Sequence, residues 1–350
     1  MLSVINIDEC FRWDSIVKSF RGYDVNYLSG YAKAFMINGD GEPLLFYYDN
    51  GKTRAINVVM KRDISELPAF KGKIPSRMWY DISTPYGYGG FLIDGEDSDA
   101  VNEAYNTFCI NNGFVCEFVR FHLINNYQNN YSGISETHTH NIIRSLELDI
   151  DEIYMDYEQK VRKNLRRANE SNLYSEIDTS GARLDDFLEI YYSTMDRTNA
   201  NGSYFFKREF FDMINKMVDN YVYVHVLSEG KVISTELVLY GSENCYSFLG
   251  GTNKDFFHLR PNDFLKHEIV KWAKAKGLKR FILGGGYGND DGIFKYKKSL
   301  APHGIFDFYI GKKIFNKEKY ITLLALKQDN LIVDMTEDDL ISGFFPQYRA

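Results

Sequence analysis

The chain has 350 residues, a length that favours two domains of ordinary size. Its composition, with 44% hydrophobic and 25% charged residues, is that of a folded globular protein and excludes a disordered chain or a small disulfide scaffold. With 41 basic and 48 acidic residues the formal charge is −7, which argues against nucleic-acid binding through overall charge but leaves room for a local basic patch.

The cysteine content and the hydropathy pattern indicate the compartment. The four cysteines are widely spaced and form no Cys-x-x-Cys pair, so we expect reduced thiols in a cytoplasmic protein. The N-terminal segment carries early acidic residues and lacks the apolar core of a signal peptide. No run reaches about 18 apolar residues, so we expect no membrane span.

The first half alternates between predicted helices and strands. Helices are expected at 9–19, 29–37 and 97–112, and strands at 43–48, 54–60, 77–82 and 114–122. A glycine-rich loop, TPYGYGGF at 84–91, follows the third of these strands. Such a loop lets a ligand approach the backbone, and Tyr86 and Tyr88 add polar groups, so we favour a ligand-facing loop over a plain turn.

The second half repeats this order of elements in pattern, though not in residues. Helices are expected at 156–171, 184–196, 207–219 and 262–276, and strands at 142–149, 221–227, 232–240, 244–250 and 279–283. Asn262 is the expected N-cap of the last helix and Gly277 its stop. The fold class predicted is therefore α+β (mixed α/β), with two units of similar plan and a cleft between them.

The densest basic segment is YEQKVRKNLRRANES at 157–171. On a helix, the basic residues fall on two faces and the apolar residues form a buried stripe. The basic residues are Lys160, Lys163 and Arg167 on one face and Arg162 and Arg166 on the other; the stripe is Val161, Leu165 and Ala168. Arginine forks suit phosphate groups, so the segment indicates either a phosphate- or RNA-binding surface or a plain solvated face.

A second chemical signal is LGGGYGNDDGIFKYKKSL at 283–300. It matches neither the dinucleotide-binding glycine motif nor the P-loop. Its backbone N–H groups can still hold an anion, and a lysine beside them can stabilise charge on a carbonyl; the alternative is a lysine-rich surface hairpin. His138 and His140 have no third ligand nearby, so no metal site is expected. No nucleophile–base motif of a hydrolase occurs.

Taken together, these segments resemble the FemABX-type acyltransferases of the wider GNAT superfamily. The matching elements are NYLSGYAKAF at 26–35, YDISTPYGYGG at 80–90, the basic helix at 157–168, YSFLGGTNKDFFHLRPNDFLKHEIVKWAKAKG at 246–277 and LGGGYGNDDGIFKYKKSL at 283–300. The resemblance spans about residues 20–312 and lacks the long helical hairpin of the larger cell-wall enzymes. It implies two tandem GNAT-like domains packed around a shared cleft: residues 1–141 with 313–350, and residues 142–312 carrying the donor site.

The resemblance also implies an activity. Such a chain is an N-acyltransferase that moves an acyl or aminoacyl group onto an amine of a cell-wall or surface-polysaccharide precursor, a nucleotide- or lipid-linked sugar or peptide. Acyl-CoA or aminoacyl-tRNA is the co-substrate, and no cofactor is bound permanently. Pro261 stands where the usual GNAT pyrophosphate loop would supply N–H groups, which argues against a CoA site of the usual kind. A catalytically inactive module that binds a nucleotide or glycan precursor, or an RNA-binding protein, stays open.

Individual site residues follow from the resemblance and from the loops. In the resemblance, Lys33 and Arg208 meet the acceptor phosphate, Tyr246 faces the acceptor, and Lys297 stabilises charge at the donor carbonyl. From the loops we add Asp291 as a catalytic base, Asp290 as a turn former and Tyr86 in the acceptor cleft. The residues expected to contact the donor are Arg162, Arg166, Asn262, Gly285, Gly286 and Lys295.

Overall fold

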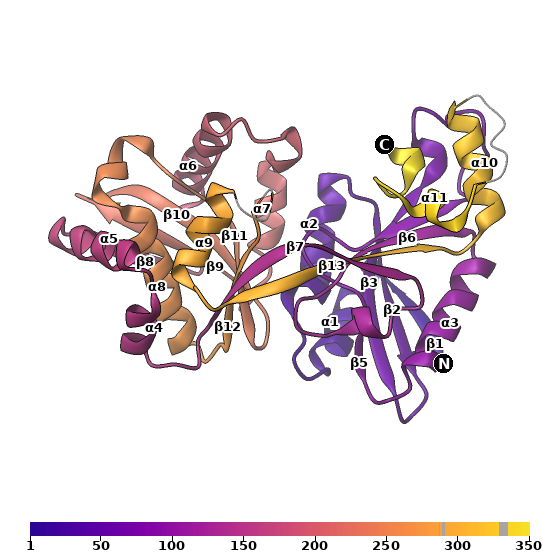
Figure 1. Cartoon of the computed structure of the whole chain (residues 1–350), viewed down its shortest axis with the longest axis horizontal. Helices are drawn as coiled ribbons and strands as arrows, with labels where there is room; N and C mark the ends of the chain where they lie inside the picture. Colours follow the sequence, from indigo (N-terminus) through magenta and orange to yellow (C-terminus); the bar gives the residue numbers. More distant parts are fainter. Residues whose placement is uncertain (287, 289–290, 329–334) are drawn as a thin grey trace. The chain divides into compact units, whose positions relative to one another are not determined.

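The computed structural model describes residues 1–286, 288, 291–328 and 335–350 (Figure 1). The chain forms two compact units, the first comprising 1–21, 26–138 and 308–350 and the second 22–25 and 139–307. Both units combine helices with strands, which confirms the mixed α/β class. Among the described helices, none has the length and the apolar character needed to cross a membrane.

The first unit is a sheet with the strand order β1-β2-β3-β4-β6-β13. Its strands are β1 (Leu2–Asn6), β2 (Glu42–Asp49), β3 (Arg54–Asp63), β4 (Tyr80–Ser83), the short β5 (Leu92–Asp94) beside β3, β6 (Phe114–Arg120) and β13 (Ile305–Ile314). Its helices are α1 (Cys10–Lys18), α2 (Ser29–Asn38), α3 (Ser98–Asn111), α10 (Lys317–Gln328) and α11 (Glu337–Ile341). Among the described strands of this unit, β4 and β6 form the parallel pair, and α3 makes the crossover that parallel strands require.

The second unit is a sheet with the strand order β7-β12-β11-β10-β9-β8. Its strands are β7 (Ile134–Ser145), β8 (Tyr174–Asp178), β9 (Tyr221–Ser228), β10 (Lys231–Tyr240), β11 (Asn244–Thr252) and β12 (Arg280–Gly284). Its helices are α4 (Ile150–Asp156), α5 (Gln159–Glu170), α6 (Leu184–Arg197), α7 (Arg208–Ile214), α8 (Pro261–Ala275) and α9 (Gly292–Leu300). Here β11 and β12 are the parallel pair, and α8 is their crossover helix.

The two units share one plan. In each unit, a hairpin (β2–β3 or β9–β10) is extended by an antiparallel strand (β4 or β11), and a crossover helix leads to a parallel strand (β6 or β12). That last strand then pairs with an antiparallel strand, β13 in the first unit and β7 in the second. The predicted tandem architecture is therefore confirmed in the strand order of the units.

Most predicted elements of the second unit are present, and two differences concern the helices α8 and α9. Helix α8 begins at Pro261 rather than after a cap at Asn262, because Arg260 occupies the N-cap position with φ of 61°. The predicted N-cap is therefore wrong, and Pro261 fills the first helical position, where its missing N–H costs nothing. Residues 292–300, left open between a loop and a surface hairpin, form the helix α9 because Asp291 caps its first turn.

A short early segment of the chain is built into the second unit. Asp24 is fully buried and accepts hydrogen bonds from Asn244 Nδ2 at 2.7 Å and from Tyr246 Oη at 2.5 Å. Asn244 and Tyr246 are themselves buried on β11. Asp24 therefore satisfies polar groups that the strand could not leave unpaired.

Replacing Asp24 by Ala is expected to lower the free energy of unfolding of the second unit by about 1–3 kcal/mol, because two buried donors lose their acceptor. Calorimetry of the whole chain measures this as a lower melting temperature for one transition. The exposed Asp8, changed to Ala, is the control and should leave both transitions in place. An unchanged transition in Asp24→Ala would contradict the structural role of this carboxylate.

Candidate functional site

The second unit contains a hollow of about 310 Å³ over strand β11. Its floor is Ser247–Thr252 of β11 together with Thr235 and Glu236 of β10. Its walls come from helices α6, α8 and α9, and the last two contribute Asn262, Lys266, Tyr296 and Lys297. Segments that are far apart in the sequence therefore meet at one polar cavity.

Strand β11 presents an open edge to this hollow. It pairs with β12 only at 244–246, whereas it stays paired with β10 as far as Thr252. Among the described residues, no strand pairs with the other edge of β11 beyond Tyr246. A bulge at Phe248 further disturbs the ladder with β10. An extended ligand can therefore form backbone hydrogen bonds along this edge.

A buried ion pair forms one wall of the hollow. Lys266 Nζ donates to Glu236 Oε2 at 2.5 Å and to Ser247 Oγ at 2.7 Å. The side chains of Lys266 and Glu236 are only 7% and 6% exposed. Within the described part of the chain, Glu236 Oε1 has no hydrogen-bond partner. Because a buried carboxylate oxygen without a partner is costly, this atom is available to a donor group on a ligand.

Lys297 brings a second ammonium group to the same hollow. Its Nζ donates to the backbone carbonyl of Gly285 at 2.6 Å. Desolvation by burial and the nearby Lys266 ammonium, opposed by Glu236 and Asp291, together lower the pKa of Lys297 to about 8. The ammonium therefore changes its charge close to neutral pH, which is unusual for a lysine.

Tyr296 adds a neutral hydroxyl group to the hollow. Burial raises the pKa of its phenol well above the ordinary value, so it stays protonated. In the part of the chain that the structure describes, its Oη has no hydrogen-bond partner. This hydroxyl can therefore donate to, or accept from, a bound ligand.

Several of the predicted donor-site residues lie around this hollow. Asn262 and Lys297 line it, and Gly285 holds the Lys297 ammonium through its carbonyl. Gly286 leaves room for Asp291, whose Oδ1 would lie 2.3 Å from a Cβ at this position. Asp290, the predicted turn former, lies outside the described residues.

Asp291 has a structural task in the described loop. Its Oδ1 accepts from Phe294 N at 2.7 Å and its Oδ2 accepts from Gly288 N at 3.0 Å. Both oxygens therefore serve the start of helix α9. Asp291 is not among the residues that line the hollow.

Other predicted residues of the second unit have local partners. Tyr246 donates to Asp24, and Arg208 forms an ion pair with Asp185 at 2.5 Å on the exposed side of α7. Arg162 donates to the carbonyls of Met155 and Tyr157 and so closes the end of α4. Arg166 and Lys295 are exposed on α5 and α9.

The remaining predicted residues belong to the first unit. Lys33 is half-buried on α2. Tyr86 lies on the glycine-rich loop with 40% of its surface exposed, and its backbone carbonyl accepts from Tyr31 Oη at 2.5 Å. For both residues, contact with the acceptor stays a prediction.

Glu236 and Lys266 are not among the site residues that the sequence predicts. Glu236 is the one charge in the strand-forming run VISTELVLY at 232–240, and Lys266 lies between the apolar residues Leu265 and Ile269 of α8. A charged residue inside an apolar pattern is a signal of a paired or functional buried charge. The two residues are 30 positions apart, so their pairing could not be read from spacing.

The chain is similar in sequence to one protein family. Residues 156–298 match the acetyltransferase (GNAT) domain family, a region that contains every residue of the hollow named above. No curated protein matches the chain.

The fold is similar to that of several solved structures. FemX matches with a TM-score of 0.67 and 13% identity, over 93% of this chain and 100% of FemX. The C-terminal domain of a putative lysylphosphatidylglycerol synthetase from Agrobacterium fabrum matches with a TM-score of 0.57 and 12% identity, over 90% and 94%. A conserved protein of unknown function from Bacteroides thetaiotaomicron has a TM-score of 0.58 and 10% identity, over 89% and 99%. At these identities the likeness establishes the fold.

Proposed function

We propose that this chain, a FemABX-like acyltransferase of the GNAT superfamily, moves an acyl or aminoacyl group from an activated donor onto an amine. The observation that carries the proposal is the hollow on β11, where a buried carboxylate with an unpartnered oxygen lies among two lysines and a tyrosine hydroxyl. The acceptor we propose is an amine on a cell-wall or surface-polysaccharide precursor. The donor is a co-substrate, a CoA thioester or an aminoacyl ester of tRNA.

The reaction requires stabilisation of negative charge on the acyl oxygen. The amine nitrogen forms a bond to the acyl carbon, the C–S or C–O bond to the donor breaks, and a proton passes from the nitrogen to the leaving group. Lys297 and Tyr296 are the donors we assign to the transient oxyanion, because both present polar hydrogens to the hollow. Alignment of the two reactants adds to this and can supply about 7–11 kcal/mol.

The proton of the attacking amine needs an acceptor, and we assign Glu236. Its Oε1 is buried without a partner among the described residues, and the Lys266 ammonium holds its Oε2. Asp291, the acid predicted from the sequence, uses both of its oxygens on backbone N–H groups. Glu236 therefore takes the role that the sequence analysis gave to Asp291.

Between the two donors, we propose aminoacyl-tRNA. Helix α5 buries Val161, Leu165 and Ala168 and exposes Lys163 and Arg166, for which the described residues provide no hydrogen-bond partner. Exposed basic side chains on one helix suit the phosphates of an RNA backbone. At the start of α8, Pro261 has no N–H to offer to a pyrophosphate group.

Binding measurements with both donors test the proposal. We expect the double substitution Lys163→Gln/Arg166→Gln to weaken tRNA binding at least tenfold and to reduce the slope of log affinity against log salt by about 1–2, because phosphate contacts are lost. The control is Lys231→Gln/Lys276→Gln, which removes the same charge from other exposed sites of the unit and should change affinity little. Saturable binding of acetyl-CoA, with tRNA binding unaffected by the α5 substitutions, would overturn the choice of donor; no binding of either donor would overturn the function.

A further inference from the structure

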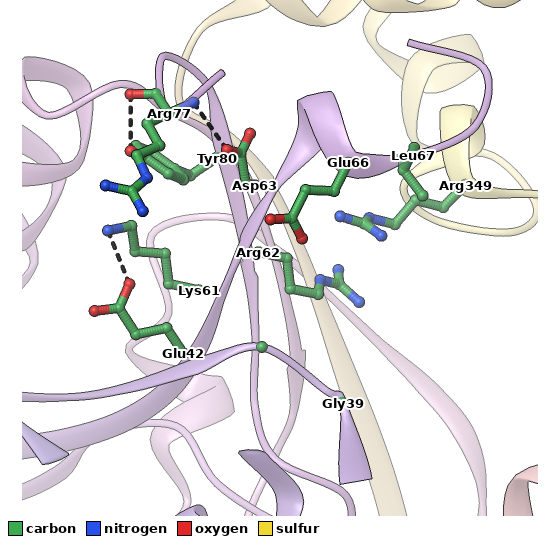
Figure 2. A pocket seen from close by; sticks show the side chains of 11 residues that line it. Gly39, Glu42, Lys61, Arg62, Asp63, Glu66, Leu67, Arg77, Tyr80 and Arg349 are labelled. Carbon is green, nitrogen blue, oxygen red and sulfur yellow. Dashed lines mark hydrogen bonds and ion pairs between the residues drawn. The ribbon is translucent and has the colours of Figure 1, made fainter. Parts of the chain in front are cut away.

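The first unit contains a larger hollow, of about 690 Å³, beside the start of β2 and the end of β3 (Figure 2). Lys61, Arg62, Arg77 and Arg349 line it together with three acidic residues, Glu42, Asp63 and Glu66. None of these residues takes part in the acyl-transfer site described above. Figure 2 shows the guanidinium groups of Arg62 and Arg349 approaching one another across the hollow.

A single buried carboxylate orients two of the arginines. Asp81 is fully buried; its Oδ1 accepts from Arg62 Nε at 2.6 Å, and its Oδ2 accepts from Arg349 Nε at 2.6 Å and from Tyr348 Oη at 2.8 Å. Both arginines bind Asp81 through Nε, and their terminal nitrogens have no hydrogen-bond partner among the described residues. Two planar forks are thus fixed in place with their donor ends free for a ligand.

Arg77 is held toward the same hollow by its backbone. Its φ is 58°, a left-handed conformation that non-glycine residues seldom adopt. Asp63 Oδ2 accepts from Arg77 N at 2.8 Å, and Tyr80 Oη donates to the Arg77 carbonyl at 2.8 Å, so both of its peptide groups are fixed. No described residue binds the Arg77 guanidinium. Strained residues that their neighbours hold in place are concentrated at functional sites.

Most acids around the hollow have local partners. Glu42 is bound by Lys61 at 3.1 Å, and Asp63 accepts from Ser65 as well as from Arg77 N, interactions that help to lower the pKa of Asp63. Of the acids that line the hollow, only Glu66 has no hydrogen-bond partner among the described residues. Four basic side chains therefore line the hollow against three acids, and the buried Asp81 behind Arg62 and Arg349 offsets the remaining positive charge. The attraction for an anion comes from the orientation of the guanidinium donors and not from an excess of charge.

We propose that this hollow binds the phosphoryl group of a small phosphorylated molecule. Three guanidinium groups present N–H donors to the hollow, and guanidinium forks bind phosphate oxygens in pairs. The volume lies within the range of about 300–1,000 Å³ that is typical of ligand sites, and it exceeds the need of a phosphate ion alone. The proposal is independent of the acyl-transfer site, which lies in the other unit.

Titration calorimetry at low ionic strength tests this site, with inorganic phosphate, glucose 6-phosphate and glucose as probes. We expect saturable binding of at least one phosphorylated probe and none of glucose. Arg77→Gln should weaken binding at least tenfold without unfolding the unit, because no described residue binds its side chain. Glu66→Gln should strengthen binding about threefold by removing a like charge, an effect that a merely structural role would not produce.

Arg12→Gln is the matched control, since Arg12 pairs with Glu9 on the surface of the same unit, and its affinity should equal that of the unsubstituted protein. Binding of glucose 6-phosphate but not of phosphate would show that the hollow also contacts the rest of the ligand. Equal binding of both would show that the phosphoryl group alone is recognised. Either result supports the site. Absence of saturable binding by both phosphorylated probes, or equal affinity in Arg77→Gln, would overturn it.

Discussion

Replacement of Lys297 by Met is expected to lower kcat/KM for acyl transfer by roughly 10²–10³-fold, the usual cost of removing one oxyanion donor. Met keeps the apolar stem of the side chain and removes only the ammonium that Gly285 holds at 2.6 Å. Lys298→Met is the matched control, because it makes the same chemical change on the next residue of α9, which does not line the hollow. Steady-state rates with a charged donor and an amine acceptor measure the effect.

The same residue gives the reaction a pH dependence. Burial lowers the pKa of Lys297 to about 8, so the charged form that stabilises the oxyanion is lost as the pH rises through that value. The rate of the unsubstituted protein should therefore fall above about pH 8, and this limb should be missing from the profile of Lys297→Met. A variant that keeps both the rate and the limb would contradict the role of the ammonium.

Stability should respond to pH in the opposite direction. The folded pKa of Lys297 lies below the ordinary value of 10.5, so between these values the unfolded chain binds more protons and stability rises with pH. Between pH 7 and pH 9.5 this difference in pKa raises the free energy of unfolding by about 2 kcal/mol. The free energy of unfolding, measured with denaturant at each pH, should show this rise in the unsubstituted protein. Subtracting the values of Lys297→Met isolates the contribution of this group, because the variant lacks it.

The second large effect is expected at Glu236. Glu236→Ala leaves the Lys266 ammonium buried without its carboxylate, so the free energy of unfolding should fall by about 3–5 kcal/mol. Glu236→Gln keeps the shape and an oxygen for Lys266 but cannot accept a proton, so its rate should fall by about 10²–10⁴-fold at a smaller cost in stability.

A double substitution separates the two roles of this pair. Glu236→Leu/Lys266→Met replaces both charges by apolar groups of similar volume and should recover much of the stability lost in Glu236→Ala. It should not recover activity, because the proton acceptor is gone. Recovery of the rate together with stability would show that the pair is structural and that Glu236 is not the base.

Local sequence patterns predict most elements of the fold because they report burial directly. Apolar runs placed the strands β9, β10 and β11 within a few residues, and the stripe of Val161, Leu165 and Ala168 is the buried face of α5. The patterns failed where a backbone angle or a distant partner decides. Arg260 at φ of 61° moved the start of α8, and a cap at Asp291 made a helix of a segment that was left open between a loop and a hairpin.

The candidate site was predictable only in the part that lies on one segment. Lys297, Gly285 and Gly286 are neighbours of one loop and helix, so the motif at 283–300 named them together. Glu236 and Lys266 come from a strand and a helix that meet only after folding, and their ion pair has no counterpart in the spacing of the sequence. The same holds for Asp24, which reaches β11 from a segment more than two hundred positions away.

The placement of β13 has a consequence for biosynthesis. Strand β6 pairs on one side with β4 and on the other with residues 310–314 of β13, which the ribosome adds almost two hundred residues after β6. Until then, one edge of β6 has unpaired backbone groups, while the second unit, at 139–307, is complete earlier. The unit that begins the chain is therefore the last to finish folding, and the nascent protein carries an open sheet edge that favours misassociation or capture by a chaperone.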